Sequence, residues 1–285
     1  MQEDIRLFLN YLAKEKKCSK NTLDAYHSDL IQLADHIAHS SSQEPAVSSK
    51  VELSEEHLAS YMAGLKVRSY TVSTIARKVA AARTFVRFMA EQGKANSDLS
   101  PRLSAPRVNK ALPQALSVAE IRKLLDETGR LPTIDGRRDQ AMLELLYATG
   151  LLASELMALN VDDVNIGEGC INITSSRGRS RKVPLDKRIQ ELMREYISSV
   201  RMKLLTSDRE QALFLNQRGA RLTRQGFWQI VQGHADAAGL STKVTPRTIR
   251  HSYAVHRLHN GADLRSVQEV LGHAHVATTR AYKQV

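Results

Sequence analysis

A proline-bearing stretch over residues 97–117, SDLSPRLSAPRVNKALPQALS, constrains the fold of this chain more than any other feature. It holds three prolines, shows no apolar periodicity and carries a net positive charge. Proline removes a backbone donor and clashes with the preceding helical turn, so no long regular element runs through such a stretch. We therefore expect a helical domain over residues 1–108, a linker over 109–116 and a second domain over 117–285.

Apolar residues recur at helical spacing through most of the first domain, which predicts an all-helical fold there. Ser19 and Ser54 stand where helix N-caps are expected, and Gly93 stands where the last helix should end. The segments with this pattern are 5–17, 22–38, 53–65 and 72–93.

The second domain is predicted to be helical apart from one change of period. Residues 167–187, GEGCINITSSRGRSRKVPLDK, alternate β-branched and polar residues around a basic turn, which predicts a hairpin with its tip near Ser176–Ser180. The fold class is therefore mostly α, with a small β-hairpin or sheet in the C-terminal domain. Helical segments are expected over 118–129, 137–150 and 153–165, and again from Lys187 to the end.

The formal net charge is +11 and the isoelectric point is about 9.7, so a polyanionic partner is expected, nucleic acid first. Both halves of the chain carry more basic than acidic residues, so both could contact the same anion. A soluble protein with a merely cationic surface fits the same composition. The proline-bearing stretch fits either a tether between two basic lobes or an ordinary surface connection.

Cysteine usage and hydropathy indicate a cytoplasmic protein. Cys18 and Cys170 are far apart and fit no metal spacing, which is typical of reduced thiols. The N-terminus is acidic and amphipathic, unlike a signal peptide, and no apolar run approaches the length of a membrane span. We therefore expect no membrane partner.

A block near the C-terminus, RTIRHSYAVHRLHNGADLRSVQEVLGHAHVATTRAY over residues 247–282, gathers five histidines. A zinc site needs three or four ligands that converge on one point. The spacing does not put three histidines on one helical face, and no cysteine or carboxylate joins them, so we expect no metal. The histidines are His251, expected to be buried and hydrogen-bonded, His256 and His259, expected at a helix surface or in packing, His273, and His275, expected in solvent.

Several segments together resemble tyrosine recombinases of the Xer and phage-integrase type. The first domain carries FLNYLAKEKKCSKNTLDAYHSDLIQL and STIARKVAAARTFVRFMAEQG; the second carries AMLELLYATGLLASELMALNVDDVN, RKVPL and the terminal LGH and TTRAY. They follow the family's order over nearly the whole chain. The resemblance implies a C-shaped clamp of two domains around duplex DNA, assembled as a homo- or hetero-tetramer. It also implies strand exchange through a covalent 3′-phosphotyrosine, without a metal, a small-molecule cofactor or external energy.

Three residues of the terminal block suit this chemistry. Tyr282 could attack the phosphate, Arg250 could hold it with a bidentate fork, and His273 could donate a hydrogen bond to the same oxygens. Taken alone, Tyr282 is typical of a surface aromatic and Arg250 of a helix ion pair. The joint pattern favours catalysis.

Three positions depart from the family's site. Leu152 stands where the family has its first arginine, and Arg247 stands where a histidine-type residue is expected. The family's site also has a lysine in the hairpin; its position corresponds to Ser176 here, or to Arg177 if the hairpin is one residue shorter. Leucine cannot compensate phosphate charge, and arginine does not exchange protons near neutral pH. The candidate catalytic residues are Tyr282, Arg250, His273, Arg247 and Arg177.

Two functions therefore stay open. The first is a site-specific recombinase or integrase, an enzyme with strand-transferase chemistry akin to that of a topoisomerase. The second is a catalytically impaired relative that binds DNA and regulates or blocks recombination, which Leu152 and Arg247 favour. A helical transcription factor would need a helix-turn-helix reader, and none is clear.

Family members commonly continue into a further helix past the tyrosine, whereas this sequence ends at Val285. The candidates for DNA contact are Lys20, Arg77, Lys78, Arg83, Arg179 and Arg181.

Overall fold

The computed structural model describes residues 1–41, 53–95, 97–108, 114–175, 178 and 180–284. Over these residues the chain forms two compact units, Met1–Lys110 and Ala111–Val285, which are described one at a time. The linker predicted over 109–116 lies partly outside the described residues, and its bounds stay a prediction. Among the described residues, no helix has the length and apolar character needed to cross a membrane.

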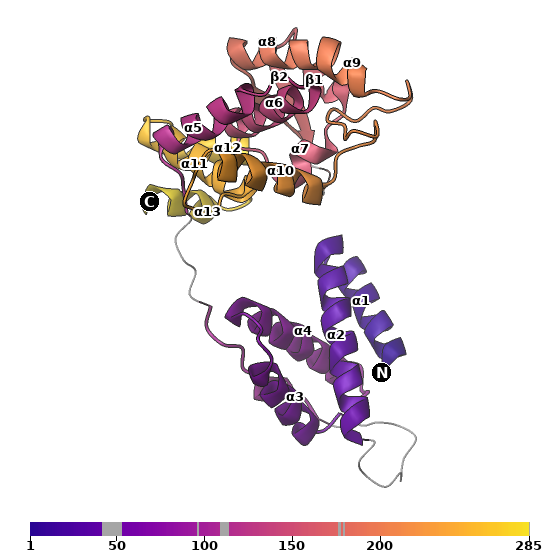
Figure 1. Ribbon diagram of the computed structural model, residues 1–285. Coiled ribbons are helices and arrows are strands. Elements are labelled where there is room, and N and C mark those ends of the chain that lie inside the picture. The colour runs from indigo at the N-terminus through magenta and orange to yellow at the C-terminus, as the bar shows by residue number, and fades with distance from the viewer. Residues whose placement is uncertain (42–52, 96, 109–113, 176–177, 179, 285) are drawn as a thin grey trace. The chain divides into compact units, whose positions relative to one another are not determined.

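The N-terminal unit is helical, as the apolar spacing predicts (Figure 1). Phe8, Leu33 and Phe85 come from three different helices and are buried in its core, where the rings of Phe8 and Phe85 lie 5.5 Å apart. Leu103 of the proline-bearing stretch is also buried in this core, so the start of that stretch belongs to the bundle. The elements are α1 (Gln2–Lys14), α2 (Lys20–Ser41), α3 (Glu55–Val67), α4 (Val72–Glu91) and the 3₁₀ turn η1 (Ser100–Arg102).

Helix α6 (Ile134–Thr149) lies at the centre of the C-terminal unit. Its Met142, Leu145 and Leu146 are fully buried, because α5 (Val118–Gly129) packs on it together with helices that follow later in the chain. The later elements that pack on it are α8 (Lys187–Glu195), a π turn η3 (Tyr196–Val200), α9 (Arg201–Leu204) and α11 (Pro246–His259). The unit also holds α10 (Arg224–Ala237), α12 (Leu264–Leu271), α13 (Val276–Arg280) and the 3₁₀ turn η4 (Ala281–Gln284).

The predicted hairpin is confirmed as part of a three-stranded antiparallel sheet. Strand β2 (Cys170–Thr174) pairs with β3 (Ser180–Pro184), with Ile171 opposite Val183, and both of these side chains are buried in the main core. The short strand β1 (Val164–Asn165) adds an edge that the sequence did not predict. The mostly helical fold class with a small sheet is therefore confirmed.

Two stretches predicted as helix are not helical throughout. Helix α7 covers only Ala153–Ala158 of the predicted 153–165, because the backbone then pairs with a distant segment. There the amide of Val161 donates to the carbonyl of Gln211 at 2.9 Å. Helices were also expected without a break after Lys187, but residues 205–223 form turns and isolated bridges. Long-range backbone pairing decides both cases, and local periodicity carries no signal for it.

Candidate functional site

Arg250 is buried on α11 and is held by the ends of two other helices. Its Nη1 donates to the carbonyl of Gly150, and its Nη2 donates to the carbonyl of Leu271, both at 2.8 Å. These carbonyls close α6 and α12, and the negative end of a helix favours a cation. Gly150 has φ 61°, and a Cβ there would lie 2.3 Å from a ring carbon of Tyr253, so only glycine fits. The guanidinium is therefore fixed before any substrate arrives.

His273 lies between Arg250 and a hydroxyl. Nη2 of Arg250 is 3.1 Å from Nε2 of His273, and Nδ1 of His273 is 2.9 Å from Oγ1 of Thr279. A guanidinium can only donate, so Nε2 accepts and Nδ1 carries the proton. Burial lowers the pKa of His273 to about 4, and the positive charges of Arg250 and Arg181 act in the same direction. The imidazole is therefore neutral near pH 7.

Tyr282 lies on η4, and its side chain is buried, with 4% of the residue exposed. Its ring stacks on that of His273 at a centroid distance of 6.1 Å, and the ring of His251 is 5.3 Å away. Burial raises the pKa of Tyr282, while Arg250 and Arg247 oppose the rise. The three predicted residues Tyr282, Arg250 and His273 are thus brought into one place by α11, the end of α12 and η4.

The two substituted positions differ in what they present. Arg247 lies exposed in the first turn of α11, one turn before Arg250, and no hydrogen bond or ion pair holds its guanidinium among the described residues. Its charge lowers the pKa values of Arg250 and His251, so it lies near both. Leu152 is the N-cap of α7 and is 45% exposed. An apolar side chain therefore stands where the family's first arginine is expected.

The sequence did not single out Glu155, which supports this site. Its carboxylate accepts two hydrogen bonds from Arg181, at 2.6 and 2.9 Å, and one from the amide of Leu152 at 2.9 Å. It also lies 3.9 Å from Arg250. Burial raises the pKa of Glu155, but the bonds from Arg181 and Leu152 outweigh it, so the pKa is lowered. The available signal was a glutamate three residues after an N-cap, the spacing of a capping box.

Arg181 was predicted to contact DNA, and in the structure its guanidinium also has partners within the C-terminal unit. Its guanidinium is half-buried and is used inside the unit, because Nε donates to the carbonyl of Val270 at 2.8 Å and the other nitrogens bind Glu155. Three of its five N–H donors are used in this way, so the contact of Arg181 with DNA stays a prediction. The remaining hairpin candidates, Arg177 and Arg179, lie outside the described residues, as does Ser176.

Four candidates for DNA contact lie in the N-terminal unit. Lys20 and Arg83 are exposed on α2 and α4, and Arg77 is partly exposed while it pairs with Asp29. Lys78, the fourth candidate, is not on the surface: it is 7% exposed, and its Nζ donates to Asp29 at 2.9 Å. The buried carboxylate of Asp29 draws Lys78 inward, because an unpaired charge in the core costs several kcal/mol.

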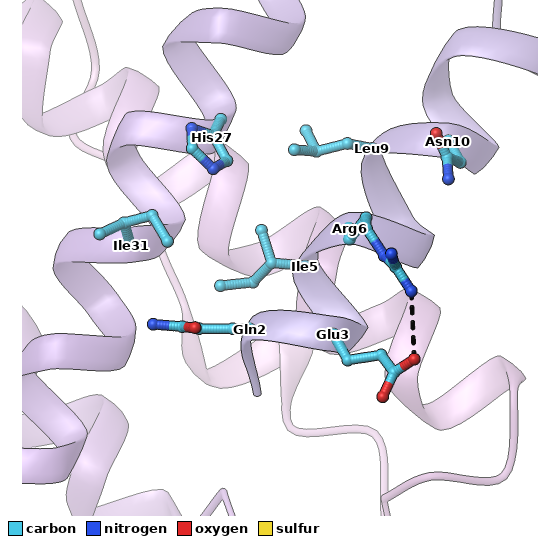
Figure 2. A pocket seen from close by; sticks show the side chains of 8 residues that line it. All are labelled: Gln2, Glu3, Ile5, Arg6, Leu9, Asn10, His27 and Ile31. Carbon is cyan, nitrogen blue, oxygen red and sulfur yellow. Dashed lines mark hydrogen bonds and ion pairs between the residues drawn. The ribbon is translucent and has the colours of Figure 1, made fainter.

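Other features of the described residues contribute nothing to this site. Figure 2 shows a hollow between α1 and α2, in which Ile5 and Ile31 face polar side chains and Arg6 pairs with Glu3 at the rim. None of the predicted site residues lines it. No group of three or more histidine, cysteine, aspartate or glutamate side chains in the described chain could hold a metal ion.

Comparison with known families decides what kind of chain this is. The profile described as the phage integrase family matches residues 114–285, and the one described as the N-terminal SAM-like domain of phage integrases matches residues 5–93. The chain belongs to the phage integrase family of tyrosine recombinases. The resemblance inferred from the sequence is therefore confirmed.

Relatives and solved structures agree with this membership. The chain is 40% identical to the tyrosine recombinase XerC of Roseiflexus sp. (strain RS-1), over all of this chain and 90% of the relative. It is 37% identical to XerD of Listeria innocua, over all of this chain and 95% of the relative. Its fold resembles a lambda integrase dimer bound to a core site, with TM-score 0.74, 15% identity and coverage of 99% and 95%. A XerH post-cleavage complex with its difH substrate gives TM-score 0.73 and 22% identity, with coverage of 92% and 76%.

Proposed function

We propose that this recombinase cuts and rejoins duplex DNA at a specific site, with Tyr282 as the nucleophile. The observation that carries the proposal is the meeting of Arg250, His273 and Tyr282 described above: a 3.1 Å hydrogen bond joins the first two, and the rings of the last two stack. Arginine supplies a fixed charge and a fork that matches phosphate oxygens. The Xer relatives, named as recombinases, support the same activity.

The reaction conserves the energy of the broken bond. The phenolic oxygen of Tyr282 attacks phosphorus, the bond to the 5′ oxygen breaks, and the chain remains joined to the DNA through a phosphotyrosine. The phenol releases its proton, and the departing 5′ oxygen takes one up. Arg250 stabilises the charge that grows on the non-bridging oxygens. Reversal by a second strand's 5′ hydroxyl completes the exchange without an outside energy source.

His273 must change its role when DNA binds. In the free protein its Nε2 accepts from Arg250 and so cannot donate to a phosphate oxygen. A phosphate anion beside Arg250 favours a protonated ring, because an opposite charge stabilises the imidazolium. We infer that DNA raises the pKa of His273 and turns Nε2 into a donor.

The oligomeric state and the cellular location are also inferred. A lambda integrase tetramer bound to a Holliday junction shares this fold, with TM-score 0.72, and we infer that this recombinase also acts as a homo- or hetero-tetramer. The two cysteines are both free thiols, which supports a cytoplasmic location.

The deciding experiment is cleavage of a nicked duplex from which the cut fragment diffuses away, so that the covalent intermediate accumulates. A protein–DNA band that resists denaturant should form with the wild type and be absent with Tyr282→Phe. If the wild type binds the duplex and forms no such band, catalysis is ruled out, and the remaining function is that of a DNA-binding relative.

A further inference from the structure

His251 is a buried residue of α11 that the proposed chemistry does not use. It follows Arg250 and is 8% exposed. Its side chain contacts the ring of Tyr282, at a centroid distance of 5.3 Å and an angle of 58°, and forms a hydrogen bond with the backbone of Gln114. Gln114 begins the entry segment, residues 114–116, through which the chain reaches α5. His251 therefore links Tyr282 to the segment by which the chain enters the C-terminal unit.

The hydrogen bond also fixes how the His251 ring is turned. Burial, together with the charges of Arg247 and Arg250, lowers the pKa of His251 to about 4, so the ring is neutral near pH 7. The bond to Gln114 acts in the opposite direction, which identifies the ring N–H as donor and the Gln114 carbonyl as acceptor. A neutral imidazole has a single N–H, so this bond sets both the tautomer and the orientation of the ring against Tyr282.

The entry segment is held on α11 along its length. The amide of Leu116 donates to Oγ of Ser252 at 2.8 Å, and His256 bonds the backbone of Leu116. Leu116 is 2% exposed in the main core, and Ala115 packs against the smaller cluster that contains Tyr282. Ser252 and His256 thus fix the segment without touching the nucleophile. Among the three α11 side chains that hold the segment, His251 is the one that contacts Tyr282.

We propose that His251 is a positioning residue that couples the entry segment to Tyr282. The inference rests on the proposed function, in which Tyr282 is the nucleophile. The chain reaches the entry segment from the N-terminal unit. When both units bind DNA, a displacement of this segment is therefore transmitted to the His251 ring and from there to Tyr282. A nucleophile must approach phosphorus within ~3–3.5 Å in line, and a misplacement of ~1 Å costs ~10²-fold in rate.

Paired substitutions separate the two contacts of His251. His251→Phe keeps a ring beside Tyr282 and removes the N–H donor, whereas His251→Gln keeps a donor and removes the ring. His256→Phe is the matched control, because it alters the other histidine that bonds the entry segment while Ser252 and core burial still hold Leu116. Thermal unfolding of each variant checks that it is folded; if one fails, the other His251 variant carries the test.

Two measurements are made on each variant. The first is the rate of covalent complex formation at saturating nicked duplex, with the dissociation constant of the duplex measured alongside. The second is the rate at which tetranitromethane nitrates Tyr282, free and on DNA, followed by mass spectrometry. Nitration reports the surroundings of the Tyr282 ring without requiring catalysis. Inserting Gly-Ser-Gly-Ser after Arg107 slackens the chain ahead of the entry segment and tests the coupling itself.

Both His251 variants should nitrate at Tyr282 several-fold faster than the wild type and form the covalent complex ~10-fold to ~10²-fold more slowly, with DNA affinity unchanged. His256→Phe should match the wild type. The insertion should alter the DNA-dependent change in nitration in the wild type and not in His251→Phe. Unchanged nitration in both His251 variants, or an equal effect of the insertion in both backgrounds, overturns the inference. If the wild type forms no covalent complex, the proposed function fails, and nitration still decides the positioning role.

Discussion

Arg181 and Glu155 form a bidentate ion pair that joins strand β3 to the first turn of α7, with N–O distances of 2.6 and 2.9 Å. Because Nε of Arg181 also binds the last turn of α12 at Val270, the pair ties three elements together around Arg250. The carboxylate lies 3.9 Å from the Arg250 guanidinium and partly balances its charge in a buried place. The position of Arg250, the proposed phosphate-binding arginine, thus depends on this pair.

Removing one partner of this buried pair should destabilise the C-terminal unit strongly. Glu155→Gln leaves Arg181 and Arg250 without their acid, and the expected loss is ~3–5 kcal/mol in the free energy of unfolding. The single tryptophan, Trp228 on α10, reports urea unfolding of this unit by fluorescence. Glu168→Gln is the control, because Glu168 and its partner Lys182 are both exposed, and its loss should leave the free energy of unfolding nearly unchanged. Equal losses from the two variants would contradict the structural role.

The stability of the C-terminal unit should fall between pH 7 and pH 5. His251 and His273 both have pKa values lowered from 6.5 to about 4, so the unfolded chain binds protons in this window that the folded chain does not. The contribution of the two neutral histidines to stability is therefore fully present above their unfolded pKa of 6.5, and it is lost as the pH falls towards their folded pKa of about 4. The expected change is on the order of 1–3 kcal/mol between pH 7 and 5, measured by the same Trp228 fluorescence. His273→Phe should flatten the slope, and identical midpoints at the two pH values would refute the prediction.

Substitutions of Lys78 and Arg83 on α4 should have different effects, the first on stability and the second on DNA binding. Lys78→Met deprives the buried Asp29 of a partner, so it should lower the thermal midpoint of the N-terminal unit without changing the salt dependence of the remaining folded protein. Arg83→Met should leave stability unchanged and reduce the slope of log affinity against log salt by ~1, as expected for a lost phosphate contact. Titrations of a labelled duplex over a range of salt concentrations measure this slope. A full salt slope in Arg83→Met would exclude Arg83 from the interface.

Limited trypsin digestion should cut first after Arg107. Residues 104–108 are exposed and without regular structure, whereas Leu103 before them and Leu116 after them are each buried in the core of a unit. A protease needs an exposed, locally unfolded segment of chain, which these burials confine to the stretch between them. Mass spectrometry of the first fragments identifies the cut. Initial cleavage inside α4 or α11 would contradict the two-unit division.

Periodicity and turn chemistry were enough to predict most helices and the β2–β3 hairpin. They failed where backbone pairing is long-range, as between Val161 and Gln211, because no local pattern marks the partner. In the site, the terminal block pointed to Tyr282, Arg250 and His273, which share one part of the sequence. Glu155 was missed, and Lys78 and Arg181 were taken as candidates for DNA contact. Each of these two basic side chains is drawn inward by a buried carboxylate on another element, and sequence spacing does not show such a partner.

Replacing Leu152 with arginine should raise the rate of covalent complex formation. Leu152 is exposed at the N-cap of α7, with its amide bound to the Glu155 carboxylate that also lies beside Arg250. A guanidinium there would face the same phosphate and stabilise the charge of the pentavalent state, with a gain of up to ~10²-fold. The gain should be larger when Arg247→His is added, because the exposed Arg247 already brings one positive charge near Arg250, and removing it relieves repulsion while restoring an imidazole.

The comparison uses wild type, Leu152→Arg, Arg247→His and the double variant on the nicked duplex, with Tyr282→Phe as the blank. The double variant should exceed either single change, because the two positions act on the same phosphate and are not independent. If Arg247→His alone lowers the rate while Leu152→Arg restores it, Arg247 supplies the charge that Leu152 lacks. If Leu152→Arg is no faster than the wild type in either background, Leu152 does not face the phosphate, and the charge opposite Arg250 comes from another residue.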